Sequence, residues 1–257
     1  MSGLAELDLS RLSELEQKRC LEVFGPDKNM RLYGRGIRRR LAPMFAGNVQ
    51  RQMLAFSLIF SIPGTPIIWY GDEIGMGDDL SQPERNSVRT PMQWSADVNA
   101  GFSTAPAKRL RRPLIDSGQF DYRLVNVQAE RRDPASLLNR VERLIRTRKE
   151  FPEFACGKYR LLESDRSDAV FAHACEDQDG NSVVAVHNFS SEPVTAKVRL
   201  WTEKLDHAVF LFGENDEGAV TNKDLPIPLE GYGYNWIRLK STATSYKKGA
   251  KTGSGNH

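Results

Sequence analysis

The feature that most constrains this sequence is an apolar helical pattern followed closely by a short β-branched and aromatic run. Residues 49–62 are nearly all apolar from Met53 onward, which predicts a buried helix with Asn48 as its N-cap and Pro63-Gly64 as its stop. Residues 66–70 read Pro-Ile-Ile-Trp-Tyr, which is typical of a parallel strand buried on both faces. A helix, a tight loop and a buried strand in this order form half of a β/α unit.

Two acidic residues, Asp72 and Glu73, come directly after this predicted strand. In β/α barrels, active sites are built at the C-terminal ends of the strands, so both side chains are expected at that rim. A long polar segment, residues 75–128, follows with little periodicity. Loops of this length inside a domain are functional or disordered, and here the arginines and aromatic residues favour an ordered, functional loop. These residues are Arg85, Arg89, Trp94, Phe102, Phe120 and Tyr122.

The second half of the chain changes from helical to strand patterns. Asp133-Pro134 is expected to open a helix, with Asp133 as N-cap and an apolar stripe made by Leu137, Leu138, Val141, Leu144 and Ile145. Six short strands then follow at 158–162, 169–174, 182–189, 194–200, 208–212 and 235–239, separated by turn residues. The sequence therefore predicts the C-terminal part of a (β/α)8 barrel over 1–153, a small antiparallel β-sandwich over 154–240 and a disordered tail over 241–257.

Composition indicates an ordinary soluble protein. The chain has 257 residues, is 40% hydrophobic and 27% charged, and its net charge of +3 is too small to imply a nucleic-acid partner. Two arginine clusters, residues 38–40 and 109–112, could bind phosphate, but solvated faces or internal ion pairs are the favoured interpretation. The three cysteines have no metal-ligand spacing and are expected to be reduced thiols in the cytoplasm. We expect neither a signal peptide nor a membrane span.

Several linked motifs resemble the α-amylase superfamily, and most closely its trehalose synthases (maltose α-glucosyltransferases). They are Gly-Ile-Arg-Arg-Arg-Leu-Ala-Pro at 36–43, Pro-Gly-Thr-Pro through Gly-Asp-Glu-Ile-Gly-Met-Gly at 63–77, Arg-Asn-Ser-Val-Arg-Thr-Pro-Met-Gln-Trp at 85–94, Asn-Ala-Gly-Phe-Ser at 99–103 and Val-Asn-Val-Gln at 125–128. The Arg-Thr-Pro-Met-Gln-Trp element also occurs in oligo-1,6-glucosidases. The Arg38-Arg39-Arg40 context and Met76-Gly77 favour trehalose synthase.

The resemblance implies a retaining reaction on an α-glucoside, carried out by an Asp nucleophile, a Glu acid/base and a second Asp. In the family the first two follow barrel strands 4 and 5, which this sequence does not contain. The second Asp belongs to an Asn-His-Asp-Glu-Leu motif, and alignment on Glu6-Leu7 puts Gly3, Leu4 and Ala5 in place of Asn, His and Asp. We therefore expect no catalytic residue in this chain and no activity from the chain alone.

The resemblance also nominates substrate-binding residues. Arg89 is expected to grip the non-reducing glucose at its 4-hydroxyl, since a guanidinium can donate to a hydroxyl and pair with a carboxylate together. Glu6 follows the missing Asp and is expected to hydrogen-bond sugar hydroxyls. Asp72 and Glu73 are expected to brace the active-site rim, and Trp94 to pin the loop or stack on a sugar. The histidines of the predicted sandwich (His173, His187 and His207) are expected to be structural, with no metal site and no cofactor.

The sequence thus predicts a fragment of an enzyme that interconverts maltose and trehalose by intramolecular glucosyl transfer, a reaction that needs a closed pocket. A fragment of a hydrolytic oligo-α-glucosidase is the alternative within the same family. An alternative of another class is a non-catalytic carbohydrate-binding protein, or a partner that completes the barrel of an upstream chain carrying strands 1–7. The expected ligand is a small α-glucoside such as maltose or trehalose.

Overall fold

The protein divides into two compact units in a computed structural model that describes residues 7–34, 36–202, 207–212 and 217–240. Unit 1 comprises residues 1–53 and 66–143, and unit 2 comprises residues 54–65 and 144–257. Glu6 and the tail predicted over 241–257 lie outside the described residues. No helix in the part of the chain that is described has both the length and the apolar character needed to cross a membrane.

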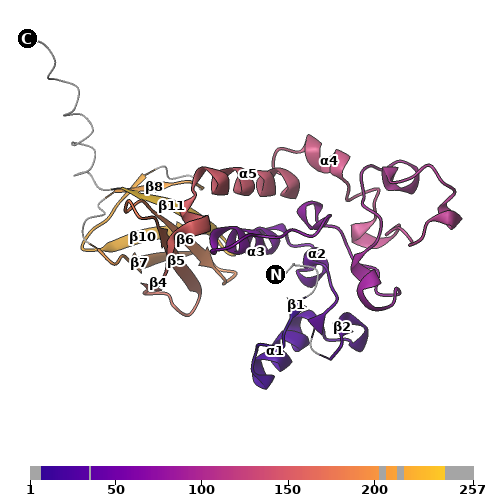
Figure 1. Cartoon of the computed structure of the whole chain (residues 1–257), viewed down its shortest axis with the longest axis horizontal. Coiled ribbons are helices and arrows are strands. Elements are labelled where there is room, and N and C mark those ends of the chain that lie inside the picture. The colour runs from indigo at the N-terminus through magenta and orange to yellow at the C-terminus, as the bar shows by residue number, and fades with distance from the viewer. Residues whose placement is uncertain (1–6, 35, 203–206, 213–216, 241–257) are drawn as a thin grey trace, which may run out of the picture. The chain divides into compact units, whose positions relative to one another are not determined.

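Unit 2 is built on one eight-stranded antiparallel sheet with the order β10-β7-β4-β5-β6-β11-β8-β9 (Figure 1). The strands are β4 (Lys158–Ser164), β5 (Val170–Glu176), β6 (Ser182–Asn188), β7 (Val194–Arg199), β8 (His207–Phe210), β9 (Glu217–Ala219), β10 (Asp224–Leu229) and β11 (Tyr234–Lys240). Strand β4 joins the two halves, because its first part pairs with β5 and its last residues pair with β7. The sheet can therefore curl, so that its two halves enclose a common core as in a sandwich.

The core of unit 2 is formed by strands that alternate buried and exposed residues together with a strand that is buried on both faces. Strand β7 alternates buried and exposed residues along its whole length, as expected for a strand with one face on the core. Val184 and Val186 of β6 pack with Ile227 of β10 and Ile237 of β11 in a single apolar cluster. All seven residues of β6 are buried, which means that its second face is covered as well.

Helical residues of unit 2 cover that second face. They come from the C-terminal part of α3 (Val49–Ser61) and from α6 (Glu153–Cys156). Ser57 and Ser61, one helical turn apart, hydrogen-bond the Nε2 atoms of His187 and His173, each at 3.0 Å. The indole N–H of Trp236 also donates to Ser57 Oγ at 3.0 Å. A buried polar seam therefore fixes helix α3 on strands β5, β6 and β11.

Unit 1 contains short elements joined by long irregular segments. Its helices are α1 (Glu14–Phe24), α2 (Leu41–Met44), the start of α3, α4 (Val127–Arg132) and the start of α5 (Leu137–Glu150). Three two-residue strands, β1 (Leu7–Asp8), β2 (Arg31–Leu32) and β3 (Gly36–Ile37), form a small antiparallel sheet. Short 3-10 turns occur at Asp72–Ile74 and, along the long segment that was predicted to be a loop, at Glu84–Val88, Val98–Gly101, Ala107–Arg109 and Gly118–Phe120.

The structure confirms most of the predicted elements. Helix α3 begins where expected, and Asn48 Oδ1 accepts from the amide of Arg51 at 2.9 Å, as an N-cap should. The six predicted strands correspond to β4, β5, β6, β7, β8 and β11. Strands β9 and β10 were not predicted. Strand β10 was missed because it contains Pro226 and Pro228, which are tolerated here since β10 lies at the edge of the sheet.

Two predicted details are wrong. Residues 66–70 do not form a strand, and Tyr70 is 40% exposed, because none of the described segments pairs with this backbone. The helix expected from Asp133-Pro134 begins later, at Leu137. Its cap is Ser136, whose hydroxyl accepts from the amide of Asn139 at 3.2 Å, while Asp133 closes a preceding turn through the amide of Ala135.

Candidate functional site

The backbone around Arg89 is held by side chains from the segment that was expected to be a strand. The indole N–H of Trp69 donates to the carbonyl of Val88 at 3.1 Å, and the hydroxyl of Tyr70 donates to the carbonyl of Thr90 at 2.8 Å. Backbone carbonyls that are removed from water need hydrogen-bond donors, and none of the described strands pairs with residues 88–90. Residues 88–90 are therefore fixed by side chains rather than by a ladder of backbone bonds.

Arg112 supplies the third of these contacts. Its Nη1 donates to the carbonyl of Arg89 at 3.2 Å and its Nη2 donates to Asn86 Oδ1 at 2.8 Å. The amide of Arg89 in turn donates to the carbonyl of Asn86 at 3.1 Å, which closes a tight turn. Arg112 thus ties residues 109–112 of the loop to the turn that carries Arg89.

Behind this segment lies a fully buried ion pair. Arg40 Nη1 contacts Asp72 Oδ1 at 3.0 Å, and both side chains have 0% exposure. The same guanidinium donates to the carbonyls of Tyr70 at 2.8 Å and Val88 at 2.9 Å. Burial raises the pKa of Asp72 to about 6, and the positive charge of Arg40 opposes that rise. Asp72 is therefore paired inside unit 1 and away from solvent, which is compatible with the expected bracing role.

In front of the segment is a pocket of about 470 Å³. It is lined by Tyr70, Glu73, Arg89, Thr90, Pro91, Met92, Trp94, Phe102, Leu110, Arg111 and Arg112. The size falls within the range of small-molecule sites, which combine apolar walls with a few polar groups. The pocket lies entirely in unit 1.

The aromatic wall of the pocket depends on a strained turn. Asn99 and Ala100 have φ values of 55° and 56°, in the left-handed region that alanine rarely adopts. The turn is held by a bond of 2.8 Å from the amide of Trp94 to the carbonyl of Ala100, and by one of 2.9 Å from the amide of Phe102 to the carbonyl of Asn99. Trp94 and Phe102 are 50% and 51% exposed, so both rings remain available for stacking.

Two charged residues of the pocket, Arg89 and Glu73, have groups without a hydrogen-bond or ion-pair partner in the described part of the chain. Among the described residues, the guanidinium of Arg89 has no carboxylate partner and lies over the ring of Trp69, with 5.9 Å from Cζ to the ring centroid. Glu73 Oε2 is buried without a hydrogen-bond partner. Such groups are costly unless a ligand or water satisfies them. Because Arg89 and Glu73 both line the pocket, it contains a donor and an acceptor for a polyhydroxylated ligand, next to its aromatic rings.

The structure brings together three of the residues singled out from the sequence, Glu73, Arg89 and Trp94. Asp72 lies outside the lining, and Glu6 belongs to the residues that are not described. Sequence reasoning did not assign Tyr70, Phe102, Arg111 or Arg112 to the site. The arginine cluster at residues 109–112 contains two of them, Arg111 and Arg112. Composition alone, however, does not distinguish arginines that line a pocket from arginines that are buried in the fold.

The other arginine cluster is internal. Arg38 donates to the backbone carbonyls of Asn29, Leu80, Gln82 and Glu84. Arg39 pairs with Asp78 at 2.8 Å, and Arg40 is used as described above. Residues 38–40 therefore organise the interior of unit 1, as the favoured interpretation of the sequence held.

The histidines that were singled out from the sequence do not line the pocket. His173 and His187 are buried in unit 2 and bonded to serines, in agreement with a structural role. Within the described part of the chain, no cluster of three or more His, Cys, Asp or Glu side chains is arranged to hold a metal ion.

Comparison with known proteins relates both halves of the sequence to known protein families. Residues 35–157 match the alpha amylase catalytic domain, and residues 180–238 match the sucrose hydrolase-like C-terminal domain. The chain is 34% identical over 248 residues to a trehalose synthase/amylase of Mycobacterium tuberculosis, covering 95% of this chain and 40% of that protein. It is 40% identical over 186 residues to a trehalose synthase of Thermus thermophilus, covering 72% of this chain and 19% of that protein.

A solved structure agrees on the fold. The trehalose-6-phosphate hydrolase of Bacillus licheniformis superposes with a TM-score of 0.62 at 20% identity, over 79% of this chain and 42% of that one. This likeness supports the predicted fold class, which combines part of a (β/α)8 barrel with a β-sandwich. The chain spans about two fifths of the length of the Mycobacterium relative that it matches.

Proposed function

We propose that this chain, which belongs to the α-amylase family and is homologous to trehalose synthases over 95% of its length, is the glucoside-gripping part of an enzyme that interconverts maltose and trehalose. The observation that carries the proposal is the meeting of Arg89, Glu73 and Trp94 in one pocket. A free guanidinium, a carboxylate and an exposed aromatic ring are the groups that a sugar ring needs for hydrogen bonding and stacking.

The proposed roles follow from the geometry. Arg89 donates to sugar hydroxyls, the carboxylate of Glu73 accepts from them, and Trp94 stacks on a sugar face. Asp72 acts through Arg40 as a brace. Glu6 keeps its proposed role of contacting sugar hydroxyls, and its test is mutation alongside Arg89.

No catalytic residue is assigned to the chain. A retaining glucosyl transfer needs a carboxylate nucleophile and a carboxylic acid, and we propose that these come from an upstream chain carrying barrel strands 1–7. The chain alone is therefore expected not to convert maltose to trehalose, which chromatography of the sugar products tests directly. We also propose a cytoplasmic location, supported by three free thiols at Cys20, Cys156 and Cys175.

The test of the binding role uses the chain as it is. Saturation-transfer NMR with maltose and with trehalose should show contact between protein and sugar protons. Replacing Arg89 with alanine removes a charged donor and should weaken binding by about one to two orders of magnitude. Arg131→Ala, an exposed arginine on α4, is the matched control and should change nothing. Equal binding by wild type and Arg89→Ala, or no binding by wild type, would reject the proposal.

A further inference from the structure

The two arginine clusters of the sequence differ in what their guanidinium groups contact. Arg38 and Arg40 use their donors on backbone carbonyls and on a buried carboxylate. Arg111 and Arg112 instead line the pocket beside Arg89. The first cluster therefore organises the fold of unit 1, whereas the second faces a cavity large enough for a ligand.

The charge of the second cluster is not neutralised within the described residues. Arg112 is held in place by the carbonyl of Arg89 and the amide oxygen of Asn86, and both of these acceptors are uncharged. Arg111 is exposed and makes no hydrogen bond or ion pair there. Arg89 has no carboxylate partner in the same set of residues either. Three guanidinium groups thus line one pocket, and none of them pairs with a carboxylate among the described residues.

The described lining residues are unequal in charge. Among them, Glu73 is the one carboxylate, against three arginines. An excess of positive charge between low-dielectric walls concentrates anions in the cavity. A guanidinium also matches the geometry of a phosphate or carboxylate group, because its planar fork donates two parallel hydrogen bonds.

The other wall of the pocket is aromatic. Tyr70, Trp94 and Phe102 line it, and each of them is at least 40% exposed. Flat apolar rings suit the face of a sugar and do nothing for a bare inorganic anion. The combination of an aromatic wall with an arginine wall calls for a ligand that has both a sugar ring and a negative charge.

We propose that the pocket also binds a glucose unit that carries an anionic group, with the sugar ring on the aromatic wall and a phosphate or carboxylate group on Arg111 and Arg112. This inference rests on the proposed function in that the same pocket receives the glucosyl unit beside Arg89. It adds a class of ligand that the pocket accepts besides neutral α-glucosides, and it gives Arg111 the role of a specificity-determining residue for the anionic group.

The test compares matched ligands on the full chain at low ionic strength by isothermal titration calorimetry. Glucose 6-phosphate should bind at least about tenfold more tightly than glucose, because charge-assisted hydrogen bonds are added. Glucuronate in a parallel titration distinguishes a carboxylate from a phosphate. The preference should shrink as salt is raised to physiological strength, since Arg111 is exposed and screened.

Two variants distinguish binding of the anionic group at Arg111 from non-specific attraction to the positive charge of the arginine cluster. Arg111→Ala should abolish most of the preference for glucose 6-phosphate over glucose. Arg109→Ala removes an exposed arginine of the same cluster that does not line the pocket, and should leave the preference intact. An equal effect of the two variants would overturn the inference, as would inorganic phosphate binding as tightly as glucose 6-phosphate.

The outcomes also separate this inference from the proposed function. If maltose binds through Arg89 but the phosphate adds no affinity, only the inference fails. If glucose 6-phosphate binds and maltose does not, the inference stands and the proposed neutral substrates are wrong. If neither sugar binds, both proposals are rejected.

Discussion

Unit 1 and unit 2 are each stabilised internally by a different kind of interaction. Unit 2 is a curled antiparallel sheet around aliphatic side chains, many of them with 0% exposure, such as Val184, Ile227 and Ile237. Unit 1 has one small sheet of two-residue strands, and its long loop is fixed by side chains that bind backbone carbonyls. The pocket is in the unit whose order depends on polar contacts.

This difference has a physical consequence. Burial of apolar surface is non-directional and tolerates small adjustments, so a sheet core can absorb modest changes. A buried arginine that satisfies several carbonyls at once cannot be replaced without leaving those carbonyls unpaired. Unit 1 should therefore depend on a few residues, and unit 2 on many.

The largest expected effect is in unit 1. Arg40→Ala leaves the carboxylate of Asp72 buried without a partner, and breaks one buried ion pair and two backbone contacts. Removing one partner of a buried pair costs about 3–5 kcal/mol. Amide hydrogen exchange should therefore accelerate across residues 69–112 while the sheet stays protected. Normal protection around Val88 in this variant would show that the ion pair is not the organising contact.

A core truncation in unit 2 should cost somewhat less. Ile237→Ala removes methyl groups from a fully buried position on β11, and such changes cost about 2–5 kcal/mol. Urea denaturation followed by circular dichroism should show a lower midpoint for the sheet. Val98→Ala, at a side chain that is 77% exposed in unit 1, serves as the control and should not change the midpoint. A loss in both variants would contradict the assignment of the core.

Acid should weaken unit 2 through its buried histidines. Burial lowers the pKa of His173 to about 4 and that of His187 to about 3, below the ordinary value of 6.5. The unfolded chain therefore binds more protons between these values, so stability is complete above about pH 6.5 and falls as pH drops toward 3. The loss should be on the order of a few kcal/mol. It should be measurable as a falling urea midpoint of the sheet.

The control for this pH dependence is the double variant His173→Gln and His187→Gln. Glutamine keeps a polar group near Ser57 and Ser61 but does not titrate. The acid-induced fall of the urea midpoint should therefore become shallower between pH 6.5 and 3. An unchanged slope would assign the acid sensitivity to other groups.

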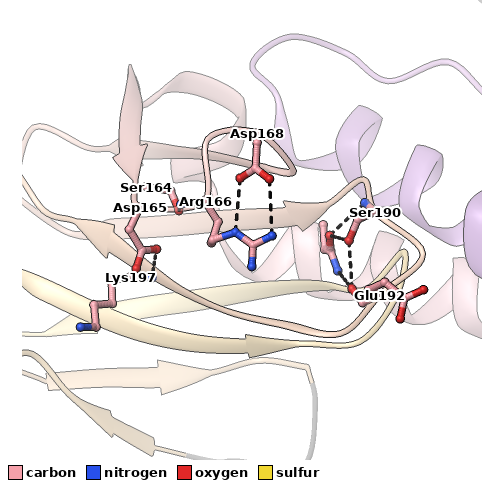
Figure 2. Close-up of polar contacts among 8 residues, drawn as sticks. Ser164, Asp165, Arg166, Asp168, Ser190, Glu192 and Lys197 are labelled. Atoms are coloured by element: carbon pink, nitrogen blue, oxygen red, sulfur yellow. Dashed lines mark hydrogen bonds and ion pairs between the residues drawn. The ribbon is translucent and has the colours of Figure 1, made fainter.

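The smallest expected effect concerns the surface loops of the sandwich. Figure 2 shows Arg166 facing Asp168 through two contacts of 3.3 and 3.4 Å, near the turn where Ser190 Oγ donates to the carbonyl of Glu192. The two side chains of the ion pair are 42% and 70% exposed, so Arg166→Ala should cost less than about 1 kcal/mol. A larger change in melting temperature would mean that this loop contributes to folding.

The sequence was most informative where a regular pattern spans a whole element. Short strand-like runs bounded by turn residues predicted six of the sandwich strands, and the apolar run at 49–62 predicted helix α3 together with its cap at Asn48. Strand β10 was missed because its prolines hide the alternation. Residues 66–70 have the composition of a buried strand, but a strand also requires a neighbour, and composition cannot supply one.

The site was predictable only in part. Arg89 was expected to bind sugar, Glu73 to brace the rim, and Trp94 to pin the loop or stack on a sugar. All three residues line the pocket, and their roles stay predictions. The roles of Arg111 and Phe102 depend on how a long irregular loop folds back. That folding is set by individual bonds such as Trp94 to Ala100, which no periodic pattern encodes.

The most direct test of the account is amide hydrogen exchange of the intact chain with and without maltose. Ligand binding slows exchange where it stabilises local structure. The account predicts slower exchange in residues 69–112, which surround the pocket, and unchanged exchange in strands β4 to β11 of unit 2. Protection confined to the sheet, or protection that persists in Arg89→Ala, would contradict the claim that unit 1 grips the glucoside.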